Sequence, residues 1–146
     1  MKKKLLYFLL ILLVLSCGKD DGAGYSPTPA PLEIPTLFGE KIIPPIIPVD
    51  NPQTVQGIAL GKKLFFDPIL SSDNSVSCAT CHLPSASFSD NSQFSTGVNG
   101  ALGTRNSMPL FNMVWNYDER FFWDGRIFSL EHQAQEPIIN LSLIHI

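Results

Sequence analysis

Cysteine is scarce in this chain: its 146 residues include only three, Cys17, Cys78 and Cys81. A four-ligand zinc site built on a Cys-x-x-Cys pair needs a second such pair, and the chain has none. A thioredoxin-like dithiol would lie next to a βαβ pattern, and no such pattern surrounds Cys78 and Cys81. The sequence therefore argues against structural zinc of this type and against dithiol redox chemistry.

Basic residues and alternating apolar residues are also lacking. The chain has ten Lys and Arg against thirteen Asp and Glu, and without residues 1–16 the count is seven against thirteen, a formal charge of −6. This charge balance disfavours contact with a polyphosphate backbone, so we expect no nucleic-acid partner.

No segment alternates convincingly between apolar and polar residues, and we therefore predict an all-α fold.

The longest apolar run lies at the N-terminus and is too short to cross a membrane. It covers eleven residues from Leu5 to Leu15 and follows three lysines, whereas a membrane-spanning helix needs ~20 apolar residues. This arrangement predicts a signal peptide over residues 1–16. Because residues 14–17, Val-Leu-Ser-Cys, resemble a bacterial lipobox, we expect Cys17 to be a lipid anchor that holds the protein to a membrane in the periplasm or cell envelope. An ordinary signal peptide followed by a stray cysteine is the alternative.

Proline is concentrated just after this signal. Eight of the twelve prolines lie between Gly18 and Pro52, where no apolar period is sustained. We interpret residues 17–52 as a Pro-rich tether, which at ~3.1 Å per residue could reach roughly 90 Å from the lipid. The apolar residues 42–48 could instead wrap across the surface of the folded part, and the sequence leaves both arrangements open.

Residues 78–82 read Cys-Ala-Thr-Cys-His, which is the attachment motif of a c-type haem. In such a motif the two thiols bond the porphyrin, and the histidine ligates the iron. The five residues could also be an inert loop that matches by chance, but in an exported chain the specificity of the motif favours haem c. Cys78, Cys81 and His82 then bind the cofactor, and no thiol remains for a disulfide.

The folded part, residues 53–140, is small for a hydrophobic core unless a buried haem fills it. Apolar positions recur at helical intervals from Thr54 to Phe66, and Asp67-Pro68 ends the predicted helix. A short helix capped by Ser77 is expected to carry the haem motif, and a loop rich in Gly, Ser and Asn follows it. Another helix is predicted over residues 129–139, with Ser129 as its N-cap.

Four blocks of sequence together resemble the N-terminal haem domain of the bacterial di-haem cytochrome c peroxidase family, which includes the MauG-like enzymes. The blocks are Leu60–Pro68, Cys78–His82, Thr104–Asn106 and Phe121–Arg126, with Ser129–Glu131 following. The resemblance implies a cytochrome c-like domain in which peroxide reacts at the N-terminal haem. Electrons would come through a second haem from a small periplasmic donor, a cytochrome c or a cupredoxin.

The resemblance therefore predicts a cytochrome c peroxidase that reduces hydrogen peroxide to water. A membrane-tethered mono-haem cytochrome that only transfers electrons is one alternative, and a MauG-like oxidase that modifies a partner protein is another. A homodimer is compatible with each of these interpretations.

The resemblance also assigns two residues to the boundary between the haem domains. Trp123 would lie between the two haems as a bridge for electron transfer, with a core aromatic beside the haem as the alternative. Asn106 matches a residue that helps to bind a calcium ion between the domains, although a loop asparagine that caps a turn would read the same.

Two further residues are assigned to the haem pocket. Gln133 matches a glutamine of the distal pocket, against the alternative of a helix-surface residue, whereas the adjacent His132 matches no role. Arg126 could pair with a haem propionate or with a nearby carboxylate, that of Asp124 or Glu131.

The sequence departs from the family pattern at the distal ligand. Many members carry a histidine sixteen residues beyond the proximal one, and here that position is Val98. Valine cannot coordinate iron, so we expect an open sixth site in the resting oxidised state. Met108 and Met113 could replace the ligand, but methionine in such a stretch is more often core filler.

The second departure is at the C-terminal end. After residues 137–140 the family continues with a catalytic glutamate and a second haem motif, whereas residues 141–146 resemble the translation of a sequencing adapter. We therefore expect the second haem domain to be missing and this fragment to be incomplete as an enzyme. His145 is excluded as a ligand, and Glu136, where the family usually has glycine, is not taken as the catalytic carboxylate.

Overall fold

The computed structural model describes residues 24–140, and within them the fold is helical. Its α-helices are α2 (Val55–Phe66), α3 (Cys78–Cys81) and α4 (Leu130–Ile139). Short 3₁₀ turns are η1 (Thr36–Lys41), η2 (Pro68–Leu70), η3 (Pro84–Ala86), η4 (Val98–Gly100) and η5 (Met113–Trp115). Strand pairing in this part of the chain is limited to isolated bridges, so the all-α prediction is confirmed there. The predicted signal peptide, Cys17 and residues 141–146 lie outside the described residues.

Helix α2 begins and ends at the predicted residues. The Oγ1 atom of Thr54 accepts a hydrogen bond from the backbone N–H of Gly57 at 3.0 Å, which caps the first turn. At the other end, the Asp67 carboxylate accepts from the Ile69 N–H at 3.0 Å, and Pro68 opens η2 instead of continuing the helix. No residue of α2 is buried.

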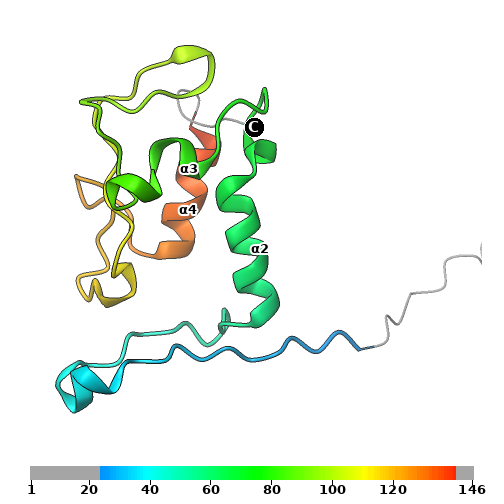
Figure 1. Cartoon of the computed structure of the whole chain (residues 1–146), viewed down its shortest axis with the longest axis vertical. Coiled ribbons are helices and arrows are strands. Elements are labelled where there is room, and N and C mark those ends of the chain that lie inside the picture. Colours follow the sequence, from blue (N-terminus) through cyan, green and yellow to red (C-terminus); the bar gives the residue numbers. More distant parts are fainter. Residues whose placement is uncertain (1–23, 141–146) are drawn as a thin grey trace, which may run out of the picture.

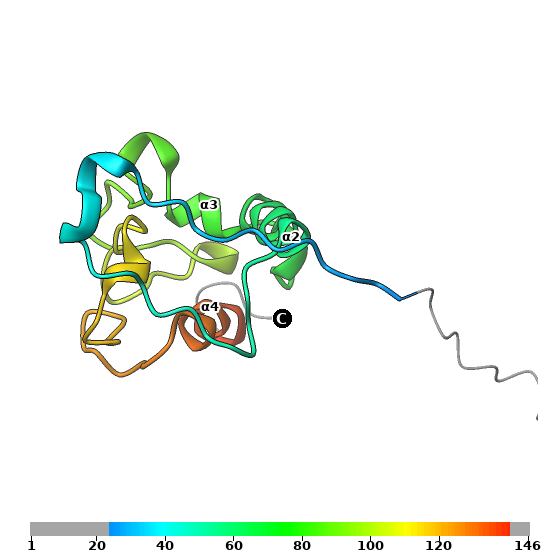
Figure 2. The same cartoon turned by 90° about the horizontal axis from the view of Figure 1, so that it is seen from below.

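Helix α4 also follows its predicted bounds. Ser129 caps it, because its Oγ accepts from the His132 N–H at 3.1 Å. Pro137 lies in the last turn. Helices α2 and α3 pack together. Helix α4 overlaps α3 in the view of Figure 1, but the turned view of Figure 2 places α4 on the opposite side of the domain from α2 and α3. In Figure 2 most of the loops between α3 and α4 lie to the left of these helices.

The hydrophobic core of the described residues is small. Four hydrophobic residues are buried: Val76, Val98, Phe121 and Ile127. Val76 and Val98 form one cluster with the partly buried Leu70 and Cys78. No side chain in residues 24–140 is less than 2% exposed. The protein alone therefore supplies little packing around the Cys78 helix, in line with the expectation that a cofactor completes the core.

Residues 24–52 run out along the domain and back to the start of α2 (Figure 1). The outgoing arm pairs with the end of the returning arm, since Ala30 N–H donates to Gln53 O and Val55 N–H donates to Thr28 O, each at 2.9 Å. Farther along, the Tyr117 hydroxyl donates to the carbonyl of Ile43. The contact of Ile43 agrees with the alternative that residues 42–48 wrap across the surface of the domain. Thr28 and Ala30 are also held, by backbone pairing next to the start of α2.

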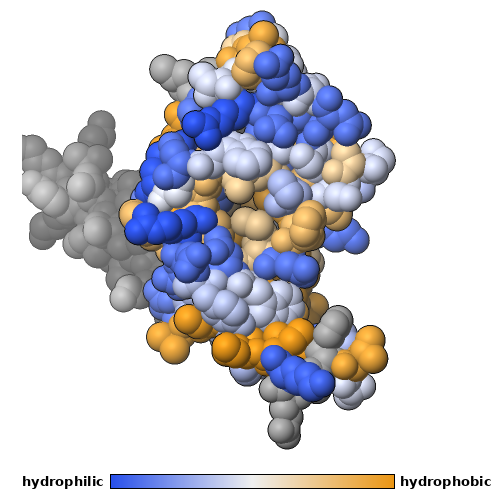
Figure 3. Space-filling model, turned by 90° about the vertical axis from the view of Figure 1, so that its left-hand side faces the viewer, coloured by the Kyte–Doolittle hydropathy of each residue, from blue (hydrophilic) through white to orange (hydrophobic). Residues whose placement is uncertain are grey.

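Within residues 24–140, no helix combines the length and the apolar character needed to cross a bilayer. The hydropathy of the surface is uneven. One face has a central recess with hydrophobic surface on its floor and hydrophilic surface around it (Figure 3). Further hydrophobic surface lies along the lower edge of this view, where the arms of residues 24–52 run.

Candidate haem-binding site

The two thiols of the haem motif lie at the two ends of the four-residue helix α3. Ser77 precedes the helix, and its backbone N–H donates to Thr80 Oγ1 at 3.0 Å, which fixes the first turn. Both cysteines are free and half-buried. Burial raises the pKa of both thiols, and the carboxylate of Asp90 raises the pKa of Cys81 further. The reactive cysteine of a redox dithiol has a lowered pKa, so this environment does not favour dithiol redox chemistry.

The imidazole of His82 is held through one ring nitrogen. Its Nδ1 lies 2.9 Å from the backbone carbonyl oxygen of Phe88. A carbonyl can only accept a hydrogen bond, so Nδ1 carries the proton and the lone pair of Nε2 remains for a metal. This is the tautomer of a metal-ligating histidine with an outer partner, which sequence reasoning could not identify. No local pattern marks the Phe88 carbonyl for this role.

The donor set fits haem c better than a bare metal ion. In residues 24–140 no three His, Cys, Asp or Glu side chains gather in a way that could hold an ion. A porphyrin brings four nitrogen ligands of its own and needs only the His82 nitrogen and two thiols for attachment. Two buried polar atoms, Trp115 Nε1 and Gln133 Oε1, have no hydrogen-bond partner in this part of the chain. Unpaired buried polar atoms are costly, so both are candidates to face a bound group.

The position of the usual distal histidine is filled by core packing. Val98 is 6% exposed and contacts the cluster of Val76 and Cys78. It contributes no atom that could ligate iron. Of the two methionines considered as replacements, Met113 lines a pocket that does not include the haem motif, and Met108 is half-buried.

Trp123 and Asn106, both predicted for the boundary between haem domains, lie together. The indole Nε1 of Trp123 donates to the backbone carbonyl of Asn106 at 3.1 Å. The Trp123 residue is 52% exposed. It is therefore not a core aromatic of the described residues, and a second group has access to its ring.

Arg126 pairs with the first of its two candidate carboxylates. Its Nη1 lies 3.1 Å and 2.8 Å from the two carboxylate oxygens of Asp124. The hydrogen bond from Arg126 is the main reason that the pKa of Asp124 is lowered. The guanidinium also lies 3.9 Å from the centre of the Phe122 ring. The other candidate, Glu131, instead accepts a hydrogen bond from Asn51 at 2.9 Å.

Neighbouring residues of α4 differ in their surroundings. Gln133, predicted for the distal pocket, is half-buried, and its Oε1 is the unpaired atom noted above. His132 is exposed, and its Nε2 lies 3.9 Å from the carboxylate of Glu136. The contrast favours Gln133 over His132 as the residue that faces a ligand.

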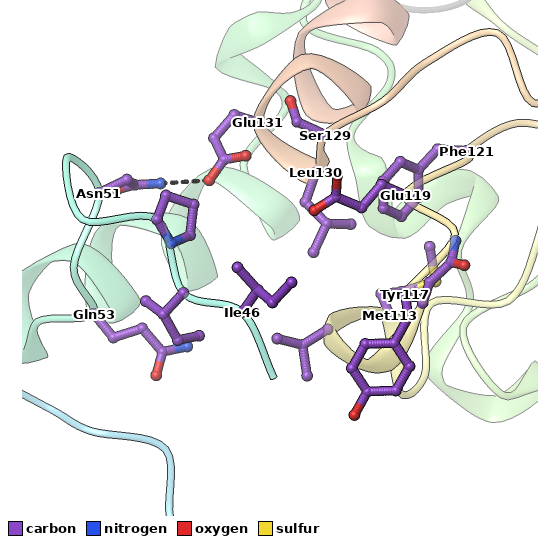
Figure 4. Close-up of a pocket in the computed structure, with 14 residues that line it drawn as sticks. Ile46, Asn51, Gln53, Met113, Tyr117, Glu119, Phe121, Ser129, Leu130 and Glu131 are labelled. Carbon is purple, nitrogen blue, oxygen red and sulfur yellow. Dashed lines mark hydrogen bonds between the residues drawn. The ribbon is translucent and has the colours of Figure 1, made fainter. Parts of the chain in front are cut away.

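A separate pocket of about 200 Å³ lies between the returning arm and the domain (Figure 4). Its apolar walls include Ile46, Met113 and Leu130, and the hydrogen bond between Asn51 and Glu131 spans one side. None of the residues 78–82 lines it. This pocket lies at the contact between the arm and the domain, and it is distinct from the haem motif.

Comparison with known proteins agrees with the motif and its surroundings. A family described as di-haem cytochrome c peroxidase matches residues 55–143. The chain belongs to the di-haem cytochrome c peroxidase family. The resemblance inferred from the four sequence blocks is thereby confirmed.

Relatives within this family include peroxidases and MauG proteins. The chain is 45% identical over 93 residues to cytochrome-c peroxidase IdrP1 of Pseudomonas sp. strain SCT, covering 63% of this chain and 24% of that protein. It is 48% identical over 91 residues to the methylamine utilization protein MauG of Methylorubrum extorquens, covering 62% and 25%. A solved MauG-like protein associated with microbial copper homeostasis matches with a TM-score of 0.65 and 33% identity, over 70% of this chain and 29% of that one. The chain thus spans about a quarter of the length of these relatives.

Proposed function

We propose that residues 53–140 form the N-terminal haem domain of a di-haem cytochrome c peroxidase, where hydrogen peroxide is reduced to water. The observation that carries the proposal is the geometry of His82. Its Nδ1 is hydrogen-bonded to the Phe88 carbonyl oxygen, so its Nε2 is left to ligate iron. It is supported by the match of the family to residues 55–143. The electrons would come from a small periplasmic donor, a cytochrome c or a cupredoxin.

Each motif residue has a separate task in this proposal. Cys78 and Cys81 hold the porphyrin by thioether bonds from the two ends of α3. His82 supplies the proximal ligand, and the Phe88 carbonyl keeps its ring in the ligating tautomer. The bound haem supplies the iron centre at which peroxide is reduced.

Four other residues are assigned by the family pattern together with their contacts. Gln133 serves the distal pocket, because its buried Oε1 has no partner in residues 24–140. Trp123, half-exposed and fixed by Asn106 O, serves as the bridge for electrons to a second haem. Asn106 contributes to a calcium site between the domains. Arg126 reaches a propionate while its Nη1 keeps the ion pair with Asp124.

The decisive first test is covalent haem attachment. The protein is expressed with a cytochrome c maturation system, and its mass is measured after denaturation. One haem should remain bound through residues 78 and 81 in the wild type and be lost when both cysteines are changed to serine. A wild-type protein that gains no haem mass would overturn the proposal.

We also propose that the sixth coordination site of this haem is open, because Val98 stands where many family members have the distal histidine. Val98 offers no ligand, so this haem should be high-spin in the oxidised protein and should react with peroxide without prior reduction. Electron paramagnetic resonance of the oxidised protein reports the spin state directly. A low-spin, bis-ligated signal from the haem on His82 would contradict the proposal.

A MauG-like oxidase is the second candidate, favoured by the 48% identity to the MauG of Methylorubrum extorquens and by the MauG-like solved structure. The two candidates differ in the axial ligand of the second haem, for which tyrosine indicates the oxidase. Because the chain spans about a quarter of its relatives, long-read sequencing of the locus is the experiment that separates them. It also decides whether residues 141–146 are translated adapter.

We further propose that Cys17 is lipidated and tethers the protein in the cell envelope. The docked arm changes the reach of such a tether. Since Thr28 and Ala30 pair with the start of α2, the distance from the lipid to the domain would be set by the residues between Cys17 and Thr28. Radiolabelled palmitate should be incorporated by the wild type and not by Cys17→Ser.

A further inference from the structure

The carboxylate of Asp90 joins three segments of the chain next to the haem motif. Its Oδ1 accepts from the Ser92 N–H at 3.1 Å. Its Oδ2 accepts from Ser95 Oγ at 2.8 Å and from the Ser107 N–H at 3.1 Å. Ser95 is 7% exposed. A carboxylate that binds partners five and seventeen residues away fixes a tertiary arrangement and does more than close a local turn.

Ser107 is engaged through three of its polar atoms. Besides the N–H bonded to Asp90, its Oγ lies 2.9 Å from Ser95 Oγ, and its carbonyl accepts from Ser89 Oγ at 2.7 Å. We call Ser89, Asp90, Ser95 and Ser107 the Asp90 cluster. Desolvation raises the pKa of Asp90, but hydrogen bonds from Ser95, Ser107 and Ser92 outweigh it and leave the pKa lowered. The carboxylate is therefore ionised at neutral pH, and its hydrogen bonds are charge-assisted.

The Asp90 cluster begins one residue after the carbonyl that holds His82. Ser87 and Phe88 both lie in the left-handed region, with φ of 57° and 58°. Non-glycine residues adopt this region rarely, and two in succession persist only where the surroundings hold them. The turn is closed by Phe88 N–H to Leu83 O at 2.8 Å and by Leu83 N–H to Ser89 O at 2.9 Å. Its outgoing end, Ser89, is fixed by the Asp90 cluster.

We infer that Asp90 is a positioning residue for the proximal histidine: through Ser89, Ser95 and Ser107 it fixes the turn whose Phe88 carbonyl holds His82 Nδ1. The inference rests on the proposed function, because His82 must ligate a haem. A firm hydrogen bond at Nδ1 makes Nε2 a stronger donor to iron and stabilises the ferric state. Loosening the turn should weaken that bond and move the reduction equilibrium toward ferrous haem.

The test compares three variants of the haem-loaded, full-length protein by potentiometric titration of the haem on Cys78 and Cys81. Asp90→Asn removes the charge and weakens the cluster. Ser95→Ala removes two cluster bonds and keeps the charge. Asp73→Asn is the matched control, because Asp73 also accepts several serine hydrogen bonds but only from Ser71 and Ser75, two residues away.

Asp90→Asn and Ser95→Ala should each shift the equilibrium between ferric and ferrous haem at least fivefold toward ferrous, and Asp73→Asn less than twofold. The iron–histidine stretching frequency in resonance Raman spectra should fall in the first two variants only. A shift in Asp90→Asn without one in Ser95→Ala would show a charge effect and overturn the positioning role. Unchanged values in both variants would also overturn it.

Failure of the proposed function is distinguishable, because then the wild type itself would carry no covalent haem. If Asp90→Asn does not fold, the milder Ser89→Ala decides. It removes the bond between Ser89 Oγ and Ser107 O and should shift the equilibrium and the Raman band in the same direction. An unchanged haem in Ser89→Ala and Ser95→Ala together would reject the inference.

Discussion

In residues 24–140, the longest helix and the region that holds the proximal histidine are different parts of the chain. Helix α2 has twelve residues and a well-formed cap, yet none of its residues is buried. The irregular loop after α3 contains the buried Val98 and Ser95 and holds the proximal His82. Regular backbone hydrogen bonding therefore does not indicate where this domain is fixed. Side-chain hydrogen bonds do that in the loop, and the proposed haem would add to them, whereas Val55, Ile58, Leu60 and Phe66 of α2 are exposed.

We expect the largest effect on stability from removing the haem attachment next to the loop. Replacing both Cys78 and Cys81 by serine should abolish covalent haem and leave a domain with only four buried hydrophobic residues in residues 24–140. Because such a small core gives little stability, the thermal unfolding transition should broaden or disappear. Circular dichroism melts of the two proteins check this, with Cys17→Ser as the control. An unchanged melting curve would mean that haem is not part of the core.

Two valines, one buried in the loop and one exposed on α2, allow the stability contributions of the two regions to be compared. Val98 is 6% exposed in the loop, and Val55 is 51% exposed in α2. Val98→Ala should lower the free energy of unfolding by ~2 kcal/mol, and Val55→Ala by less than ~0.5 kcal/mol. Chemical denaturation of the haem-loaded protein measures both. Equal losses would show that the exposed face of α2 is covered in the whole protein.

A smaller effect concerns the contact between the docked arm and Tyr117. Tyr117→Phe removes the hydroxyl that donates to the Ile43 carbonyl and should cost ~1 kcal/mol or less, because the hydroxyl is exposed and water can replace it. Hydrogen exchange of residues 42–48 should become faster while that of α2 is unchanged. Tyr25→Phe, at a 74% exposed tyrosine, is the control and should leave exchange unaltered in both segments.

The smallest effect is the pH dependence of the contact between the arm and α4. The hydrogen bond from Asn51 is the main cause of the lowered pKa of Glu131. A lowered carboxyl pKa adds stability above the unfolded value of ~4.3, and the gain is lost as pH falls through the folded pKa. The stability difference between wild type and Asn51→Ala should therefore be present at pH 7 and absent near pH 3. A difference that persists unchanged at pH 3 would contradict this assignment.

Local sequence was sufficient to predict features that depend on neighbours along the chain. Ser129 was identified as a cap, and Asp67-Pro68 as a helix end, because each acts on groups within three or four residues. The haem motif is similar, since two thiols and a histidine within five residues already specify their chemistry. The same local reasoning left the Pro-rich segment ambiguous, because its partners, Gln53 and Tyr117, lie far along the chain or on another surface.

By itself, the sequence determined the cofactor class, the family and the bounds of α2 and α4. The partner of His82, the carboxylate that pairs with Arg126 and the position of residues 28–52 became known from the folded arrangement. The difference lies in how far apart along the chain the interacting groups are. Caps and attachment motifs act within a turn of backbone, whereas Phe88 O, Asp124 and the Asp90 cluster reach their partners through a fold that brings separate segments together.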